Sequence, residues 1–504
     1  MIKILKKKFK PRIKARVRKN KQILSRNIDN LFGWIKGAEL VELRLDYLSG
    51  DVRFRELLDD RPGPVIVTCR REKDGGKYTG SEASRLSMLR MAIAEGVEFV
   101  DIEEDIATEI TRYGDTKRII SLHDFHKTPS DLRSIHARMS TLDADIIKIA
   151  TLANTPDDNI QMFDLMQSAA IPTIGICMGE IGTPSRLLAG KFGAPFTYAT
   201  FHAERSLAPG QLSFSEMRDI YHYDQIKADT DVYAVIGDPI AHSHSPLIHN
   251  AAFRAIGTNA VYLPMRIRSE HLEAFLHNAP RMGIRGISIT IPHKEAVAKL
   301  LKQVDRVIVG TGAANTLIFS PTGMVGYNTD SRAAIDSLEM RLPEDADGLE
   351  DKTVLILGAG GAAKAVAYSL LSRGADVVIS SRTQERSQKL TQQLDCRSVS
   401  WKSRHGIECS VLINCTPVGM HPNVDSTPFD RHYLKPSMTV LDTVYNPENT
   451  LLIKEAQSQG CVTVTGTEMF VRQAALQFRL FSGVEPPEEI MRETLRRSVG
   501  AVNV

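Results

Sequence analysis

The sequence lacks long apolar segments, closely spaced cysteines and repeats. No apolar run among its 504 residues reaches the roughly 18 residues that a membrane-spanning helix needs, and none has the form of a signal-peptide core. The six cysteines include no C-x-x-C pair, which argues against a zinc site and against a disulfide framework. No repeat of about 20 to 50 residues and no long low-complexity tract is present. We therefore expect a cytoplasmic globular protein without a metal centre, made of about two to four domains.

The charge is distributed unevenly along the chain. The formal net charge is +3, but residues 1–22 hold 11 lysines and arginines and no acid, so the rest carries 52 basic against 60 acidic residues. Such a tail could bind nucleic acid or anionic lipid, or serve in targeting, although it lacks the serines of a typical transit peptide. We favour a disordered basic extension over residues 1–21, and expect neither a nucleic-acid nor a membrane partner.

Short apolar runs alternate with helical patterns between about residues 40 and 202. The runs are VELRLDYL, PVIVTCR, FVDIEED, RIISLHDF, DIIKIAT, PTIGICMG and TYATFH. Strands that alternate with helices in this way are typical of parallel β/α units. We therefore predict an α/β protein whose first half forms a (β/α)8 barrel.

One strand of this barrel is difficult to locate. It should precede a helix expected near residues 22–37, where the chain offers only the basic tail and a brief MIKIL. Either the tail supplies a poor first strand or that strand is absent.

Lys148 stands out within DADIIKIA, which otherwise has the composition of a buried strand. Burial removes solvation from an ammonium group and so favours the neutral amine, which is a nucleophile. A lysine at a strand end could instead extend to water. The neighbouring runs favour the first interpretation, because several also end in polar side chains and the C-terminal strand ends of a barrel converge on one mouth.

Six motifs follow one another along these strand ends. They are E-L-R-L-D (Glu42, Arg44), C-R-R-E-K-D (Arg70, Asp74), S-L-H-D-F (His123), I-I-K-I-A (Lys148), S-R-L-L-A (Arg186) and A-P-G-Q (Gln211). With this content and order, residues 22–215 resemble the type I 3-dehydroquinate dehydratases. That family has a serine four residues before the glutamine, where this chain has Leu207 with Ser206 beside it.

The resemblance implies a role for each residue. Lys148 would form a Schiff base with the substrate ketone, which stabilises the carbanion left when the neighbouring carbon loses a proton. His123 would remove that proton and later help the hydroxyl leave. The residues implied in substrate binding are Arg186, for a carboxylate, and Glu42, Arg44, Arg70 and Gln211.

A polar segment, DQIKADTD, precedes a second set of motifs. They are S-H-S (Ser243, Ser245), S-I-T-I-P-H-K (Thr290, Lys294), A-A-N-T (Asn315), Y-N-T-D (Asp330), V-Y-N-P (Tyr445) and V-R-Q-A-A (Gln473). From residue 231 onward the chain resembles the shikimate dehydrogenases over nearly its whole length. The resemblance implies that Lys294 and Asp330 transfer a proton during ketone reduction, and that the other motif residues bind a ligand with a carboxylate and several hydroxyls.

The stretch KTVLILGAGGAAKAVAYSLLSRGADVVISSRT predicts a strand, a glycine-rich turn, a helix and a second strand. This is the Rossmann arrangement, in which the helix start receives a pyrophosphate. The second strand is followed by arginines and hydroxyls rather than an acid, which favours the 2′-phosphate of NADP over NAD. The predicted cofactor contacts are Gly358, Ala359, Gly360, Gly361, Ala362, Ser381, Arg382, Thr383 and Arg386, with Thr416, Gly466 and Met469 in nicotinamide-side loops that match the family.

Together the resemblances imply a bifunctional dehydroquinate dehydratase/shikimate dehydrogenase that converts 3-dehydroquinate to 3-dehydroshikimate and reduces the product to shikimate with NADP(H). We expect the dehydratase barrel at residues 22–224, a linker at 225–230, the substrate-binding domain at 231–340 and 467–504, and the Rossmann domain at 341–466. Two alternatives remain: a catabolic quinate or shikimate dehydrogenase, which the two arginines disfavour, and a non-catalytic metabolite-sensing regulator, which the presence of every catalytic residue disfavours.

Overall fold

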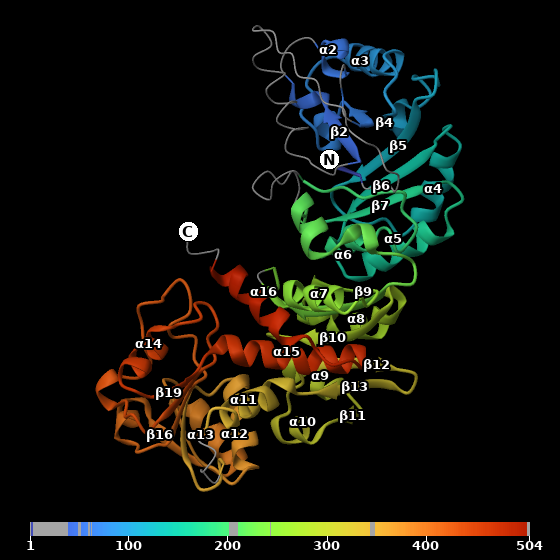
Figure 1. Ribbon diagram of the computed structural model, residues 1–504. Coiled ribbons are helices and arrows are strands. Elements are labelled where there is room, and N and C mark those ends of the chain that lie inside the picture. Colours follow the sequence, from blue (N-terminus) through green and yellow to red (C-terminus); the bar gives the residue numbers. More distant parts are fainter. Residues whose placement is uncertain are drawn as a thin grey trace, which may run out of the picture. The chain divides into compact units, whose positions relative to one another are not determined.

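The computed structural model describes residues 2–3, 39–48, 52–58, 61, 63–200, 210–241, 243–342 and 348–500. The chain divides into two compact units, Met1–Thr230 and Asp231–Val504, here called unit 1 and unit 2 (Figure 1). Of the predicted basic extension over residues 1–21, the structure describes only Ile2–Lys3, and the helix expected near residues 22–37, Ser206 and Leu207 lie outside the described residues. Within the described ranges, no helix combines the length and the apolar character that crossing a membrane requires.

Unit 1 is built on one curled sheet with the strand order β1-β2-β3-β4-β5-β6-β7. Its strands are β1 (Ile2–Lys3), β2 (Leu40–Arg44), β3 (Val65–Thr68), β4 (Phe99–Glu103), β5 (Lys117–Asp124), β6 (Ile146–Leu152) and β7 (Thr173–Met178). The helices are α2 (Phe54–Leu58), α3 (Glu82–Ala94), α4 (Leu132–Ser140), α5 (Asp157–Ser168) and α6 (Thr183–Leu187). Helices α3, α4 and α5 pack against the strands on the outer face of the curl (Figure 1).

Strands β2 to β7 are parallel and match six of the seven predicted runs. The seventh, TYATFH, forms only an isolated bridge between Thr200 and Ser213 in the part of the chain that is described. The predicted first strand reduces to Ile2–Lys3, which pairs antiparallel with β2. A (β/α)8 barrel closes when its first and last strands pair in parallel. In the described residues β1 is antiparallel and does not pair with β7, so the sheet is open and curled rather than a closed ring.

The inner face of this sheet carries one apolar and one polar layer. Side chains alternate between the two faces of a strand, so residues two positions apart share a face. The apolar layer consists of Leu40, Ile66, Phe99, Ile119, Ile146 and Ile174. Two residues further along the strands lies the buried polar layer, which consists of Glu42, Thr68, Asp101, Ser121 and Lys148.

Unit 2 contains two six-stranded sheets. The first has the order β11-β13-β12-β10-β8-β9, with strands β8 (Asp231–Gly237), β9 (Ala260–Arg266), β10 (Ile284–Ile289), β11 (Gln303–Val304), β12 (Thr316–Ser320) and β13 (Gly323–Tyr327). Its helices are α7 (Ser245–Ala255), α8 (Leu272–Asn278), α9 (Lys294–Leu300) and α10 (Arg306–Thr311).

The second sheet is parallel throughout, with the order β16-β15-β14-β17-β18-β19. Its strands are β14 (Thr353–Leu357), β15 (Asp376–Ser381), β16 (Arg397–Ser400), β17 (Val411–Asn414), β18 (Thr439–Asp442) and β19 (Val462–Val464). The remaining helices are α11 (Thr329–Glu339), α12 (Gly361–Leu371), α13 (Gln384–Leu394), α14 (Leu451–Ser458), α15 (Gly466–Ser482) and α16 (Glu488–Gly500). The central strands are apolar on both faces because separate hydrophobic clusters cover each side.

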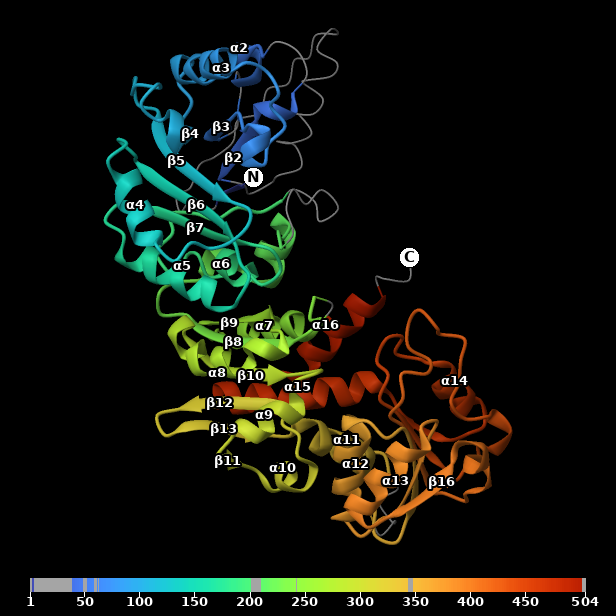
Figure 2. The same cartoon turned by 180° about the vertical axis from the view of Figure 1, so that it is seen from behind.

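Helix α15 joins the two sheets of unit 2. It contacts β10 and β12 of the first sheet and α11, which packs against the second (Figure 2). Its buried apolar residues Val471, Ala474, Ala475, Phe478 and Phe481 belong to the core of the first sheet, whereas Met469 belongs to the core of the second. The predicted substrate and cofactor residues therefore lie on elements that one helix connects.

Candidate active sites

Lys148 lies in the buried polar layer of unit 1, with only 4% of its surface exposed. Its Nζ donates a hydrogen bond of 2.9 Å to Oδ2 of Asp101 on β4, and it lies 4.6 Å from the centre of the Tyr198 ring. The lysine is therefore a buried strand residue, as the sequence predicted, and it does not extend to water.

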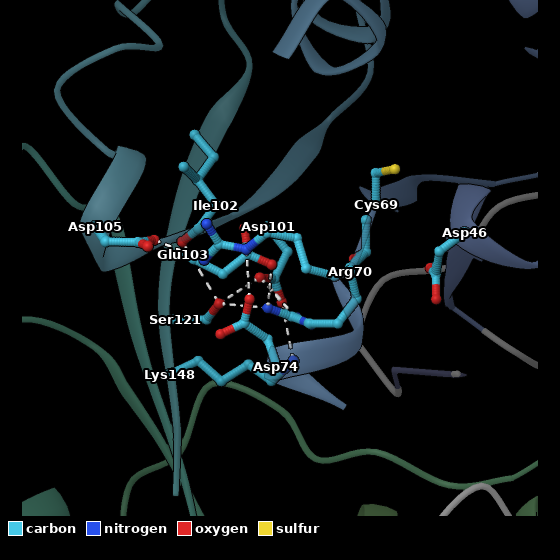
Figure 3. Close-up of polar contacts among 12 residues, drawn as sticks. Asp46, Cys69, Arg70, Asp74, Asp101, Ile102, Glu103, Asp105, Ser121 and Lys148 are labelled. Carbon is cyan, nitrogen blue, oxygen red and sulfur yellow. Dashed lines mark hydrogen bonds and ion pairs between the residues drawn. The ribbon is translucent and has the colours of Figure 1, made fainter. Parts of the chain in front are cut away.

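Asp101 is the residue that sequence reasoning missed. Its Oδ1 accepts from Ser121 Oγ at 2.6 Å and pairs with Arg70 Nη2 at 2.9 Å (Figure 3). Although burial opposes ionisation, the positive charges of Arg70 and Lys148 hold the pKa of Asp101 well below its usual range. Asp101 is an acid inside the apolar run FVDIE, just as Lys148 is a basic residue inside an apolar run. The pattern that identified Lys148 could therefore also have identified Asp101.

Arg70 is the centre of an ion-pair network rather than a free cation. It is 3% exposed, and besides Asp101 its guanidinium contacts Glu103 and Ser121, each at 2.9 Å. Glu103 also accepts from the buried Arg85 at 2.6 Å. These contacts fix the Arg70 side chain among protein groups, and its predicted contact with substrate stays a prediction.

His123 lies near the C-terminal end of β5, two residues beyond Ser121 on the same face. Burial lowers its pKa well below the ordinary value, and the nearby charges of Arg70 and Lys148 act in the same direction. Its Nδ1 is buried without a hydrogen-bond partner among the described residues. A neutral imidazole with an unengaged nitrogen can accept a proton.

Arg186 lies in α6 with 3% of its surface exposed, and the described residues provide no carboxylate partner for it. Its Nε is buried and unpaired, and burial lowers the pKa of the guanidinium to about 10. A buried cation without a countercharge is costly unless a ligand supplies one. The site therefore fits a ligand that carries a carboxylate.

The other predicted residues of unit 1 differ in their surroundings. Glu42 accepts from Thr68 Oγ1 at 2.7 Å through Oε1, while its buried Oε2 has no partner among the described residues. Arg44 forms a bidentate ion pair with Asp46, in which Nε and Nη2 donate to the two carboxylate oxygens at 2.8 and 2.7 Å. Asp74 accepts from Arg71 at 2.6 Å, and Gln211 is half-buried.

In unit 2, Nζ of Lys294 lies 2.6 Å from Oδ2 of Asp330, and both side chains are half-buried. Lys294 begins α9, and Asp330 lies in the first turn of α11. Helix α11 is capped by Asn328, whose side chain accepts from Ser331 N at 3.3 Å. The two helix starts therefore hold the predicted proton-transfer pair together.

Some of the predicted substrate residues of unit 2 are already engaged with the protein. Asn315 Nδ2 donates to Thr329 Oγ1 at 2.9 Å, and its Oδ1 accepts from Thr329 N at 2.7 Å, so this side chain ties β12 to α11. Gln473 donates to Phe470 O at 3.0 Å within α15.

Burial raises the pKa of Tyr445, whose ring contacts His244 and Phe470. Ser243 and Ser245 stand at the start of α7, and Thr290 follows β10.

The glycine-rich turn between β14 and α12 leaves room for a ligand. Gly358 has φ +117°, and a Cβ there would lie 2.9 Å from Cys415 O, so only glycine fits. A Cβ at Gly360 or Gly361 would meet nothing within 4 Å, and no side chain caps α12. Ala359 and Ala362 complete this turn, which fits a pyrophosphate at a helix N-terminus.

The turn after β15 contains positively charged side chains that are exposed to solvent. Arg382 and Arg386 are exposed, and neither forms an ion pair with the residues that the structure describes. Ser381 Oγ accepts from Thr383 N at 3.3 Å. Two unpaired guanidiniums beside hydroxyls suit a phosphate monoester.

The remaining predicted cofactor residues come from two loops. Thr416 Oγ1 donates to Asn414 Oδ1 at 2.7 Å, just beyond β17. Gly466 begins α15 so close to Val444 that a Cβ would lie 2.2 Å from its carbonyl oxygen. Met469 is buried one turn further on.

Among the described residues, no group of three or more His, Cys, Asp or Glu could hold a metal ion.

Comparisons with known families match the same two units. The Type I 3-dehydroquinase model matches residues 20–228. Models of the Shikimate dehydrogenase substrate binding domain, the Shikimate / quinate 5-dehydrogenase and the Shikimate 5′-dehydrogenase C-terminal domain match residues 235–317, 342–413 and 466–496.

Individual relatives agree with these matches. A chloroplastic bifunctional 3-dehydroquinate dehydratase/shikimate dehydrogenase of Arabidopsis thaliana is 39% identical over 479 residues, which covers 90% of this chain and 79% of that protein. A shikimate dehydrogenase (NADP(+)) of Methanosarcina barkeri is 40% identical over 275 residues, or 52% of this chain and 97% of that protein. A crystal structure of a shikimate dehydrogenase in complex with NADP+ matches with a TM-score of 0.51 and 34% identity, covering 54% of this chain and 97% of the other.

Proposed function

Because the chain belongs to the family of bifunctional 3-dehydroquinate dehydratase/shikimate dehydrogenases, we propose that it catalyses two consecutive reactions. Unit 1 dehydrates 3-dehydroquinate to 3-dehydroshikimate, and unit 2 reduces that ketone to shikimate with NADPH. One observation carries the proposal: each unit holds a lysine paired with a carboxylate, Lys148 with Asp101 and Lys294 with Asp330.

In unit 1, the unprotonated form of the Lys148 amine attacks the ketone carbon. The resulting carbinolamine takes up a proton and loses water, which gives a protonated imine. His123 then removes a proton from the adjacent carbon, and the electron pair is delocalised into the imine as an enamine. The enamine expels the β-hydroxyl, which takes the proton from His123 and leaves as water. Hydrolysis of the imine then releases the product and restores the lysine.

The other residues of unit 1 bind and orient the substrate. Arg186 receives its carboxylate, since this buried guanidinium lacks a partner among the described residues. Asp101 holds the lysine amine at one position on the inner face of the sheet. Fixing the amine near the bound ketone replaces a bimolecular encounter with an intramolecular one.

In unit 2, the hydride for the carbonyl carbon would come from NADPH when that cofactor is bound. Lys294 donates the proton that the carbonyl oxygen then needs, and Asp330 keeps the ammonium oriented through its 2.6 Å contact. The turn at Gly358–Ala362 would hold the pyrophosphate, and Thr416, Gly466 and Met469 would contact the nicotinamide side. Arg382 and Arg386 would bind the 2′-phosphate, which is the basis for proposing NADP rather than NAD.

We assign the parts of the chain accordingly. The dehydratase occupies residues 22–224, a linker occupies 225–230, the substrate-binding domain occupies 231–340 and 467–504, and the NADP-binding domain occupies 341–466. The relative from Arabidopsis thaliana is described as chloroplastic, so the cytoplasmic location expected from the sequence stays a prediction.

A coupled assay tests both reactions at once. Purified full chain is mixed with 3-dehydroquinate, and the absorbance of the enone product is followed with and without NADPH. We expect the absorbance to rise in both cases and to be consumed only with NADPH. Absence of turnover at both steps would contradict the proposal and favour a sensing role, whereas a preference for NAD with quinate would indicate a catabolic dehydrogenase.

Borohydride trapping tests the covalent step separately. Borohydride reduces the imine, so substrate should become attached to Lys148 in the unmodified chain. Lys148→Ala should abolish the attachment while the reduction of added 3-dehydroshikimate continues, which controls for overall folding. Attachment of substrate to the Lys148→Ala protein would rule out this lysine as the nucleophile.

A further inference from the structure

Asp442 is a fully buried carboxylate at the carboxyl end of an inner strand in the second sheet of unit 2. It is the last residue of β18 and pairs in register with Asn414, the last residue of β17. In open parallel sheets, ligands bind outside the carboxyl ends of the strands. The predicted roles of Thr416 and Tyr445 place cofactor and substrate contacts on the loops that follow these two strands.

Three donors from three segments converge on this carboxylate. Oδ1 accepts from Asn414 Nδ2 at 2.9 Å and from Val444 N at 3.0 Å. Oδ2 accepts from Thr450 Oγ1 at 2.6 Å. The side chain therefore joins the end of β17, the loop after β18 and the start of α14.

Each contact continues toward a predicted site residue. Asn414 Oδ1 accepts from Thr416 at both N, 3.0 Å, and Oγ1, 2.7 Å, so it fixes the loop on the cofactor side. Val444 precedes Tyr445, which is predicted to contact the substrate. The Val444 carbonyl also packs against Gly466 at the start of α15, the helix that carries Gln473.

Two N–H donors face Oδ1 and the Thr450 hydroxyl faces Oδ2. An asparagine could still accept from both N–H groups, but its amide nitrogen would donate to Thr450 Oγ1, which would have to turn its own proton away, and the negative charge shared by the three contacts would be lost. No ion pair to Asp442 occurs among the described residues, so its interactions are these three hydrogen bonds. Burial raises the pKa of Asp442 to about 6, while the three donated hydrogen bonds favour the ionised carboxylate.

We infer that Asp442 is a positioning residue for the dehydrogenase reaction, because it sets the loop that carries Thr416 against the loop that carries Tyr445. The inference rests on the proposed function of unit 2. In this role Asp442 contacts neither substrate nor cofactor. Its effect is to fix the nicotinamide side of the cofactor relative to the substrate ketone.

The test uses the full chain and three variants: Asp442→Asn, Thr450→Val and Thr450→Ser. Thr450→Val removes the donor to the carboxylate together with the Oγ1 that caps α14 by accepting from Ile453 N, at nearly constant volume, and Thr450→Ser restores both contacts. For each protein we would measure the dehydrogenase kcat, the KM for 3-dehydroshikimate, the Kd for NADPH and the amount of NADPH bound per chain. The dehydratase rate reports on unit 1, which the changes do not touch.

We expect Asp442→Asn to lower kcat by about tenfold or more, because misplacement of reacting groups by a fraction of an ångström has effects of this order. The Kd for NADPH should change less than about threefold, since the pyrophosphate and 2′-phosphate contacts lie elsewhere. Thr450→Val should show a smaller loss of kcat, and Thr450→Ser should recover it. This split between kcat and binding is not expected from a residue that only supports the fold.

Two results would overturn the inference. One is an Asp442→Asn or Thr450→Val protein with a kcat within about twofold of the unmodified chain. The other is a loss of activity fully accounted for by a lower amount of NADPH bound per chain. Absence of dehydrogenase activity in the unmodified chain would instead contradict the proposed function itself, so the two failures are distinguishable.

Discussion

Lys148 Nζ lies 2.9 Å from Asp101 Oδ2, and both side chains are buried on the inner face of the unit 1 sheet. The carboxylate also binds Arg70 and Ser121, so one acid holds two cations and a hydroxyl. A lysine that must reach a substrate ketone is thereby kept at a fixed position.

The first prediction concerns this carboxylate. Asp101→Asn removes the negative charge while keeping the shape, which leaves Lys148 and Arg70 buried with a neutral partner. Removing one member of a buried ion pair costs about 3–5 kcal/mol of the free energy of unfolding. We also expect imine trapping by borohydride to slow by about tenfold or more.

Ser121→Ala is the matched control for Asp101→Asn. It removes a hydrogen bond to the same carboxylate but keeps the charge, so trapping should slow by less. An Asp101→Asn protein that is trapped as fast as the unmodified chain would show that the contact has no role in catalysis.

The second prediction concerns the pH dependence of dehydration. The pKa of His123 is lowered by burial and by the charges of Arg70 and Lys148, so the imidazole stays neutral, and able to accept a proton, below the ordinary histidine value of 6.5. As the pH falls through the lowered pKa, the base of the free enzyme becomes protonated and kcat/KM falls. We expect the acid limb of kcat/KM for dehydration to lie below pH 6.5. A limb at or above that pH would contradict the assignment of His123 as the base.

The third prediction separates the two activities. Lys294→Met should lower the dehydrogenase kcat by about a hundredfold to ten-thousandfold, because the reduced carbonyl oxygen loses its proton donor. The dehydratase rate should not change. Lys299→Met, at an exposed lysine of the same helix, is the control and should behave as the unmodified chain. Equal effects of the two substitutions would exclude a specific role for Lys294.

The fourth prediction concerns cofactor choice. Replacing Arg382 and Arg386 by alanine should raise the KM for NADPH by about a hundredfold or more, since charge-assisted hydrogen bonds contribute about 1.5–3 kcal/mol each and at least two are lost. The KM for NADH should change little, because NADH lacks the 2′-phosphate. Lys389→Ala, an exposed cation on the same helix, controls for general electrostatic effects. A parallel change for both cofactors would argue against a 2′-phosphate site.

Much of the fold could be predicted because its signals are local. Strands β2 to β7 were visible as short apolar runs, since strand length and composition depend on neighbouring residues. The turn from Gly358 to Gly361 was equally visible, because a cluster of glycines marks such a turn and the positive φ of Gly358 demands glycine at that position. The strand expected in TYATFH was not found as a strand, since within the described residues only Thr200 finds a pairing partner there.

The sequence by itself determined which residue types stand at the strand ends, and so which chemistry is available. Only the tertiary structure decided their partners. Lys148 and Asp101 are 47 positions apart, and Lys294 and Asp330 are 36 apart. These pairs depend on the register of parallel strands and on how helix starts pack, which are non-local properties. Arg70 was predicted to contact substrate, but in the structure it lies in a network with Asp101 and Glu103. The register of β3 and β4 places those carboxylates beside it.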